Sequence, residues 1–265
     1  MIVRDVLQAM RLRTCAIGVL KTTMEEFVKH PSLPQFKIFG TGFLIAPLTV
    51  LTNRHVLASI AAFIANESLP KERRYVSFLR PETSGVAQTY HEIEKMGMII
   101  EPKSVDVGLV SFRATQEDPI RTLSPVAVPS YFSGEVGDPI AVYGYAFGEN
   151  LLKREYGEHE RTYRFGPILQ HGYISAISPF EHAPAADRLL LDVRTARGMS
   201  GSPVFHPTTG SVLAVHSSGM EDTVAFAIPI SSQFISECLA IHPLGSPGGT
   251  LEGTASWVRT NPPPS

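Results

Sequence analysis

The stretch RGMSGSPVF, residues 197–205, places a serine between glycines and ends in a proline followed by two apolar residues. A serine hydroxyl is a weak nucleophile without a base beside it, and the oxyanion formed by its attack needs converging N–H donors. Gly198 allows the N–H groups of Gly198 and Ser200 to converge, while Gly201 leaves room for a ligand. The alternative interpretation is a Gly/Ser turn before a buried strand.

Residues 40–57, GTGFLIAPLTVLTNRHVL, form a second informative stretch. A glycine-flanked apolar run, a turn at Pro47 and a second apolar run lead to His55, the one histidine among nine in such a context. An imidazole is the side chain most often used as a general base. A surface histidine, or one satisfied within the core, is the alternative.

Residues 104–112, SVDVGLVSF, place Asp106 before an apolar run suited to a buried strand. A carboxylate that accepts the second N–H of a histidine fixes its tautomer and stabilises the imidazolium. The alternative is an aspartate at a strand edge that caps a turn.

The three segments together resemble the motifs of chymotrypsin-like serine peptidases. The chain order His, Asp, Ser is that of chymotrypsin, whereas other triad folds use other orders. The Gly-Ser-Pro ending is closest to bacterial HtrA-like peptidases and glutamyl endopeptidases. The resemblance covers about residues 14–232 and implies an all-β fold of two antiparallel six-stranded barrels. It implies these site residues: catalytic His55, Asp106 and Ser200, with an oxyanion hole at Gly198, Met199 and Ser200.

The resemblance also implies a specificity pocket beside the serine, with walls at 194–197 and 215–219. Thr195 and His216 occupy positions where glutamyl endopeptidases have a threonine and a histidine. Because a hydroxyl and an imidazole can bind carboxylates or amides, we expect a preference for Glu, then Gln or Asp, before the scissile bond. The alternative is a small apolar pocket, as in many HtrA-like enzymes. The expected pocket residues are Arg194, Thr195, His216, Ser217 and Ser218.

Short apolar or β-branched runs between turn signals predict many short strands. They lie at 16–21, 36–45, 50–52, 75–80, 107–112, 139–144, 171–177, 188–193, 203–205, 212–216 and 224–228. Helical spacing predicts helices at 3–13, 56–65 and 231–241. We expect one peptidase domain at 1–242, with barrels at about 14–115 and 131–232 joined by a linker at 114–130. A charged loop follows at 147–167, and a disordered Pro/Gly-rich tail at 243–265 leaves no PDZ domain.

Composition excludes several classes of protein. A net charge of -2 gives no electrostatic footprint for nucleic acid or an anionic membrane. No apolar run approaches the ~18 residues of a membrane span, and the N-terminus has no secretory pattern, so we expect a cytoplasmic protein. The two cysteines, Cys15 and Cys238, agree with that expectation, although a single bridge between them stays open.

We therefore expect a serine endopeptidase that cleaves a protein or peptide substrate through an acyl-enzyme, with no metal or organic cofactor. Two alternatives remain at this stage: a catalytically silent binding or scaffold module on the same fold, and a hydrolase of esters.

Overall fold

The computed structural model describes residues 2–29, 35–82, 85–98, 105–146, 166–179, 186–220 and 224–241. The expected tail and nearly all of the charged loop lie outside these described residues. Within the described part, no helix is both long enough and apolar enough to cross a membrane.

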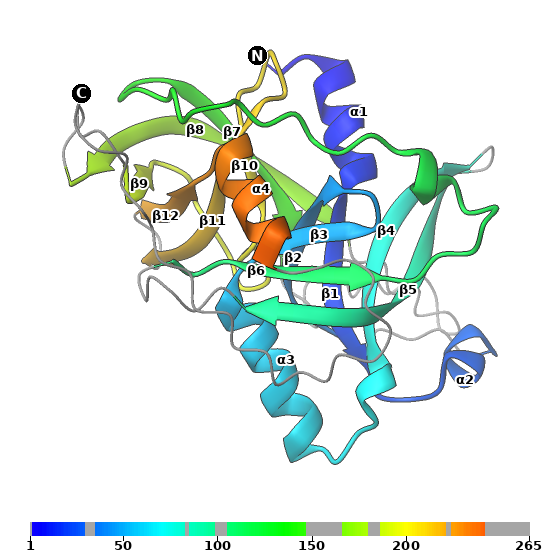
Figure 1. The fold of residues 1–265 in the computed structure, drawn as a ribbon. Coiled ribbons are helices and arrows are strands. Elements are labelled where there is room, and N and C mark those ends of the chain that lie inside the picture. The colour runs from blue at the N-terminus through cyan, green and yellow to red at the C-terminus, as the bar shows by residue number, and fades with distance from the viewer. Residues whose placement is uncertain are drawn as a thin grey trace, which may run out of the picture.

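The first half of the chain forms a closed antiparallel barrel with the strand order β1-β2-β3-β6-β5-β4 (Figure 1). Its strands are β1 (Thr14–Leu20), β2 (Phe36–Ala46), β3 (Thr49–Thr52), β4 (Arg74–Glu82), β5 (Gly85–Met98) and β6 (Gly108–Phe112). Every residue of β1, β3 and β6 is buried, as the sequence of these apolar runs predicts.

The second half forms another closed barrel with the order β10-β11-β12-β9-β8-β7. Its strands are β7 (Pro139–Tyr145), β8 (Pro167–Ser178), β9 (Arg188–Leu191), β10 (Pro203–Phe205), β11 (Val212–Met220) and β12 (Val224–Pro229). The prediction of two antiparallel six-stranded barrels is therefore confirmed.

Strand β5 was not predicted. Only His91, Ile93 and Met96 are buried among its described side chains, and a register shift between Ile93 and Lys95 breaks the period of two. Charged neighbours and this irregularity hide the alternation by which a strand is recognised in sequence.

Helices cover the ends and the junction of the barrels. The three predicted helices are present as α1 (Arg4–Arg13), α3 (Arg54–Asn66) and α4 (Ser232–Ile241), and a short α2 (Met24–Lys29) was not predicted. The 3₁₀ turns η2 (Lys71–Arg73) and η3 (Pro119–Thr122) lie in connections of the first barrel and of the segment that follows it. The segment between the barrels bonds to both of them, through Val126 N–H to the Leu44 carbonyl and Val212 N–H to the Ala127 carbonyl.

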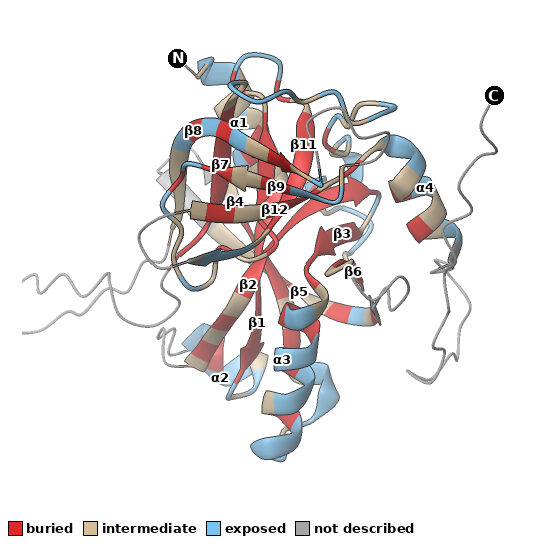
Figure 2. Cartoon of the chain, turned by 90° about the vertical axis from the view of Figure 1, so that its left-hand side faces the viewer, coloured by how far each residue is buried: buried red, intermediate tan, exposed pale blue. Residues whose placement is uncertain are grey.

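One apolar cluster joins the two barrels and two helices into a single body. It contains Phe43 and Leu51 of the first barrel, Phe205 of the second, Met10 of α1 and Ile235 of α4. Figure 2 shows buried strands through the middle of both barrels, whereas α3 is exposed along much of its length. Both cysteines are buried and free, so the structure excludes the disulfide between Cys15 and Cys238 that the sequence allowed.

Candidate active site

Pairing between β3 and β6 brings the predicted histidine and aspartate together. Thr52 pairs with Gly108 in an antiparallel ladder, so the residues just after β3 face the residues just before β6. His55 then lies in the first turn of α3, and Asp106 lies two residues ahead of β6.

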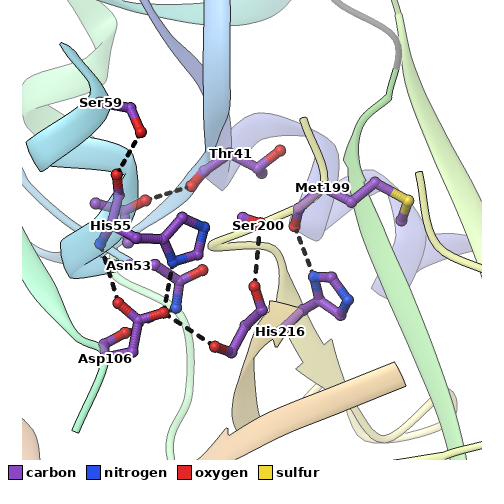
Figure 3. Close-up of polar contacts among 10 residues, drawn as sticks. Thr41, Asn53, His55, Ser59, Asp106, Met199, Ser200 and His216 are labelled. Atoms are coloured by element: carbon purple, nitrogen blue, oxygen red, sulfur yellow. Dashed lines mark hydrogen bonds and ion pairs between the residues drawn. The ribbon is translucent and has the colours of Figure 1, made fainter. Parts of the chain in front are cut away.

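Asp106 holds the backbone and the ring of His55. The Nδ1–H group of His55 donates to Oδ2 of Asp106 at 2.5 Å, and the His55 N–H donates to Oδ1 at 3.0 Å. The hydroxyl of Ser217 also donates to Oδ2, at 3.0 Å. Figure 3 shows the ring between the carboxylate and Ser200, so its second nitrogen, Nε2, is turned away from Asp106.

Asn53 fixes the position of Asp106 from the other side. It is the N-cap residue of α3, but its side chain makes no capping bond. Instead its amide donates to the Asp106 main-chain carbonyl at 2.8 Å. Asn53 therefore gives up a capping interaction, ordinarily worth about 1 kcal/mol, to position the aspartate.

The hydrogen bonds keep Asp106 ionised. Burial raises the pKa of this carboxyl group, but the bonds from His55 and Ser217 outweigh burial and hold its pKa below the ordinary value. A carboxylate that stays ionised can orient the imidazole and stabilise it when it gains a proton.

Ser200 lies in a tight turn before β10. Gly198 and Gly201 on either side have φ values of 94° and 88°, a region that only glycine adopts without strain. A side chain on Gly201 would collide with the carbonyl oxygen of Thr41. The turn therefore depends on both glycines of the sequence motif.

Some N–H groups of this turn donate to carbonyl groups of the protein, and others have no such acceptor in the part of the chain that the structure describes. Met199 N–H donates to the Ala196 carbonyl at 3.1 Å, and Gly201 N–H donates to the His216 carbonyl at 2.8 Å. Within the described residues, the N–H groups of Gly198 and Ser200 have no acceptor in the protein. Of the three residues predicted for the oxyanion hole, Gly198 and Ser200 thus have available donors, and Met199 does not.

The Ser200 hydroxyl donates to the main-chain carbonyl of Ser217 at 3.1 Å rather than to His55. The His55 side chain is 47% exposed, so solvent or a substrate can reach the ring. A direct bond between the serine hydroxyl and the histidine ring is absent from this structure. Such bonds are often long or absent in free enzymes and form when substrate binds.

The predicted pocket residues separate into an inner and an outer group. His216 is 2% exposed, and the Thr195 hydroxyl lies so close to Gly219 that a side chain there would collide with it. Arg194 and Ser218 are exposed, and Ser217 is turned toward Asp106. His216 and Thr195 are thus the inner candidates, whereas Ser217 belongs with the aspartate.

His216 is a neutral ring in a fixed tautomer. Burial lowers the pKa of His216 to about 4. Nδ1 lies 3.1 Å from the carbonyl oxygen of Met199, so this nitrogen carries the proton. Nε2 is buried without a partner among the described residues, which leaves it as an acceptor.

Comparison with known proteins agrees with this architecture. A family model described as trypsin-like peptidase domain matches residues 40–215. No curated protein shows significant sequence similarity to the chain.

Solved structures with a similar fold are proteases of low sequence identity. The active form of the Rv3671c protease from M. tuberculosis has a TM-score of 0.53 at 19% identity, covering 92% of this chain and 86% of that one. Deg5 has a TM-score of 0.53 at 18% identity, covering 85% and 87%. The HtrA-type protease AlgW with a tripeptide has a TM-score of 0.56 at 14% identity, covering 89% and 62%.

Proposed function

The chain belongs to the family of trypsin-like peptidases as a serine endopeptidase, and we propose that Ser200, His55 and Asp106 carry out its chemistry. The observation that carries the proposal is the His55 ring, held by Asp106 at 2.5 Å beside a turn with two available N–H donors.

In the proposed reaction, Nε2 of His55 takes the Ser200 proton while the serine oxygen attacks the substrate carbonyl. The Gly198 and Ser200 N–H groups bind the oxyanion, and Asp106 stabilises the imidazolium. His55 then returns the proton to the leaving amine. Water, activated by the same imidazole, hydrolyses the acyl-enzyme and regenerates the serine.

A fluorophosphonate probe tests this assignment without knowledge of the substrate, because it labels only an activated serine. We expect labelling of the native chain, loss of labelling in Ser200→Ala, and unchanged labelling in Ser236→Ala on the exposed face of α4. Labelling that survives in Ser200→Ala would remove Ser200 from the mechanism. Digestion of a peptide library beside an ester substrate separates peptidase from esterase activity.

We further propose that the inner pocket selects Glu, Gln or Asp before the scissile bond. The support is a buried imidazole whose Nε2 has no partner among the described residues, together with the hydroxyl of Thr195. A neutral ring accepts a hydrogen bond from a glutamine amide. A glutamate carboxylate accepts hydrogen bonds, so it can bond to Nε2 only if His216 gains a proton, whereas the Thr195 hydroxyl can donate to it at any pH.

This pocket predicts different pH dependences for the two substrates. The pKa of free His216, about 4, rises when a carboxylate binds, so glutamate binding weakens as pH rises from about 4 to the pKa of the complex and levels off above it. Glutamine binding does not involve this proton. The ratio of kcat/KM for Glu over Gln should fall by up to about tenfold per pH unit within that window, and any pH effect common to both substrates cancels in the ratio. A library profile without enrichment of Glu, Gln or Asp would reject the pocket assignment.

A further inference from the structure

We infer that Thr41 is a positioning residue that keeps the Gly198 donor of the oxyanion hole aimed at the substrate. This inference rests on the proposed function. Thr41 lies in β2 of the first barrel, is fully buried, and reaches across the junction to the serine turn of the second barrel (Figure 3).

The hydrogen-bond partners of the Thr41 hydroxyl fix which bond it accepts and which it donates. Tyr145 N–H, at the end of β7, donates to Oγ1 at 2.9 Å, so the hydroxyl must accept there. Its single proton is left for the Gly198 carbonyl, which lies at 2.8 Å. Thr41 N–H also donates to the Ser200 carbonyl at 2.8 Å, and Thr52 donates to the Thr41 carbonyl at 2.7 Å.

The peptide units on the two sides of Met199 are therefore anchored from different barrels. The Met199 carbonyl accepts from His216 Nδ1 and from Ser202 N–H, at 3.1 and 3.0 Å. Because a trans peptide points its N–H opposite to its C=O, these bonds direct the Ser200 N–H the other way. Both anchors lie in the second barrel.

Gly198 has a different anchor. It lies at φ 94° and, having no Cβ, can rotate to other conformations at little cost. Its carbonyl is held by Thr41 of the first barrel, which fixes the peptide unit between Gly198 and Met199 and so restricts ψ of Gly198. Without this bond, the described contact that remains for this peptide unit is the Met199 N–H bond to the Ala196 carbonyl, which lies next to the same turn. The Gly198 end of the turn then has no described anchor in the first barrel, and the direction of its N–H group is less restricted.

Thr41→Val keeps the shape of the side chain and removes both bonds of the hydroxyl, whereas Thr41→Ser keeps them. We expect kcat to fall about 10- to 100-fold in the valine variant with KM within about twofold, because the donor acts on the transition state. Affinity for a peptide aldehyde, which forms an oxyanion on Ser200, should fall in parallel. Affinity for the matching carboxylate product peptide should stay unchanged.

The serine variant should recover kcat to within about threefold of the native value. Thr49→Val is the matched control, because it also removes a buried hydroxyl of the first barrel, bonded to the Pro47 carbonyl. It should lower thermal stability and leave kcat unchanged. All assays are run well below the melting temperature of each variant.

The possible results distinguish a failure of the proposed function from a failure of the positioning role of Thr41. A native chain that neither labels with fluorophosphonate nor cleaves peptides overturns the proposed function. Native activity with equal kcat in Thr41→Val overturns the positioning role alone. Equal losses of aldehyde and product affinity also overturn it, because they indicate a general distortion. Failure of Thr41→Ser to recover activity counts against the hydroxyl in the same way.

Discussion

The two barrels contribute to the site in different ways. In the first barrel, His55 and Asp106 are brought together by strand register and joined by bonds between side chains. In the second barrel, Ser200 lies in a turn shaped by Gly198 and Gly201 and held through bonds to the turn's own main-chain groups. In the first barrel the chemistry depends on which side chains are present, and in the second it depends on which backbone conformation is allowed.

The largest loss of kcat/KM should come from removing a reacting side chain, either Ser200 of the second barrel or His55 of the first. We expect Ser200→Ala and His55→Ala each to lower kcat/KM by ~10⁵–10⁶-fold, with the double variant no worse than either single one. The losses do not add because the serine and the base act in the same step. Kinetics on the best library peptide measure all three variants, and additive losses would show that the barrels act independently.

A smaller effect should follow from changing the orienting groups of the first barrel. Asp106→Asn keeps the size of the side chain but favours the wrong histidine tautomer, so kcat should fall by ~10³–10⁴-fold. Ser217→Ala removes one of several bonds to the same carboxylate, so kcat should fall by about tenfold or less. Steady-state kinetics decide the order, and a Ser217→Ala loss as large as that of Asp106→Asn would contradict it.

The smallest expected effect is on the free energy of unfolding. Two glycine-to-alanine variants distinguish the cost of the close contact between Gly201 and the Thr41 carbonyl from the cost of a positive φ alone. Gly201→Ala adds positive-φ strain and a collision with the Thr41 carbonyl, so it should cost about 3–4 kcal/mol. Gly210→Ala is the control, since its φ is 73° but its nearest neighbour is a Val6 methyl 3.3 Å away. It should cost about 1–2 kcal/mol. Denaturant unfolding measures both, and equal costs would show that the close approach is unimportant.

The sequence predicts the site where a motif is contiguous. His55, Asp106 and Ser200 each lie in a short segment whose neighbours predict the strand or turn around them. Gly198 was likewise expected from the conformation that such a turn needs. Local pattern is enough for these features because the local chain determines them. Gly201 was expected to leave room for a ligand, but the space beside it is occupied by the Thr41 carbonyl and the Thr52 hydroxyl.

Contacts between distant segments could not be predicted in this way. Asn53 and Thr41 are ordinary polar residues of their own segments, and only the fold places them beside Asp106 and Gly198. Ser217 was expected in the pocket, but a register shift in β11 between His216 and Ser218 accompanies its turn toward Asp106. A shift of this kind changes which way a side chain points and leaves no periodic signal.

The helix α1 links the beginning of the sequence to the turn that follows β10. Met10 packs in the cluster shared by both barrels, and Val3 N–H donates to the Pro207 carbonyl at 3.2 Å. During synthesis on the ribosome this segment emerges early, but the surface that receives it is complete only after β10 has been made. Docking of α1 must therefore be a late event in the maturation of the nascent chain.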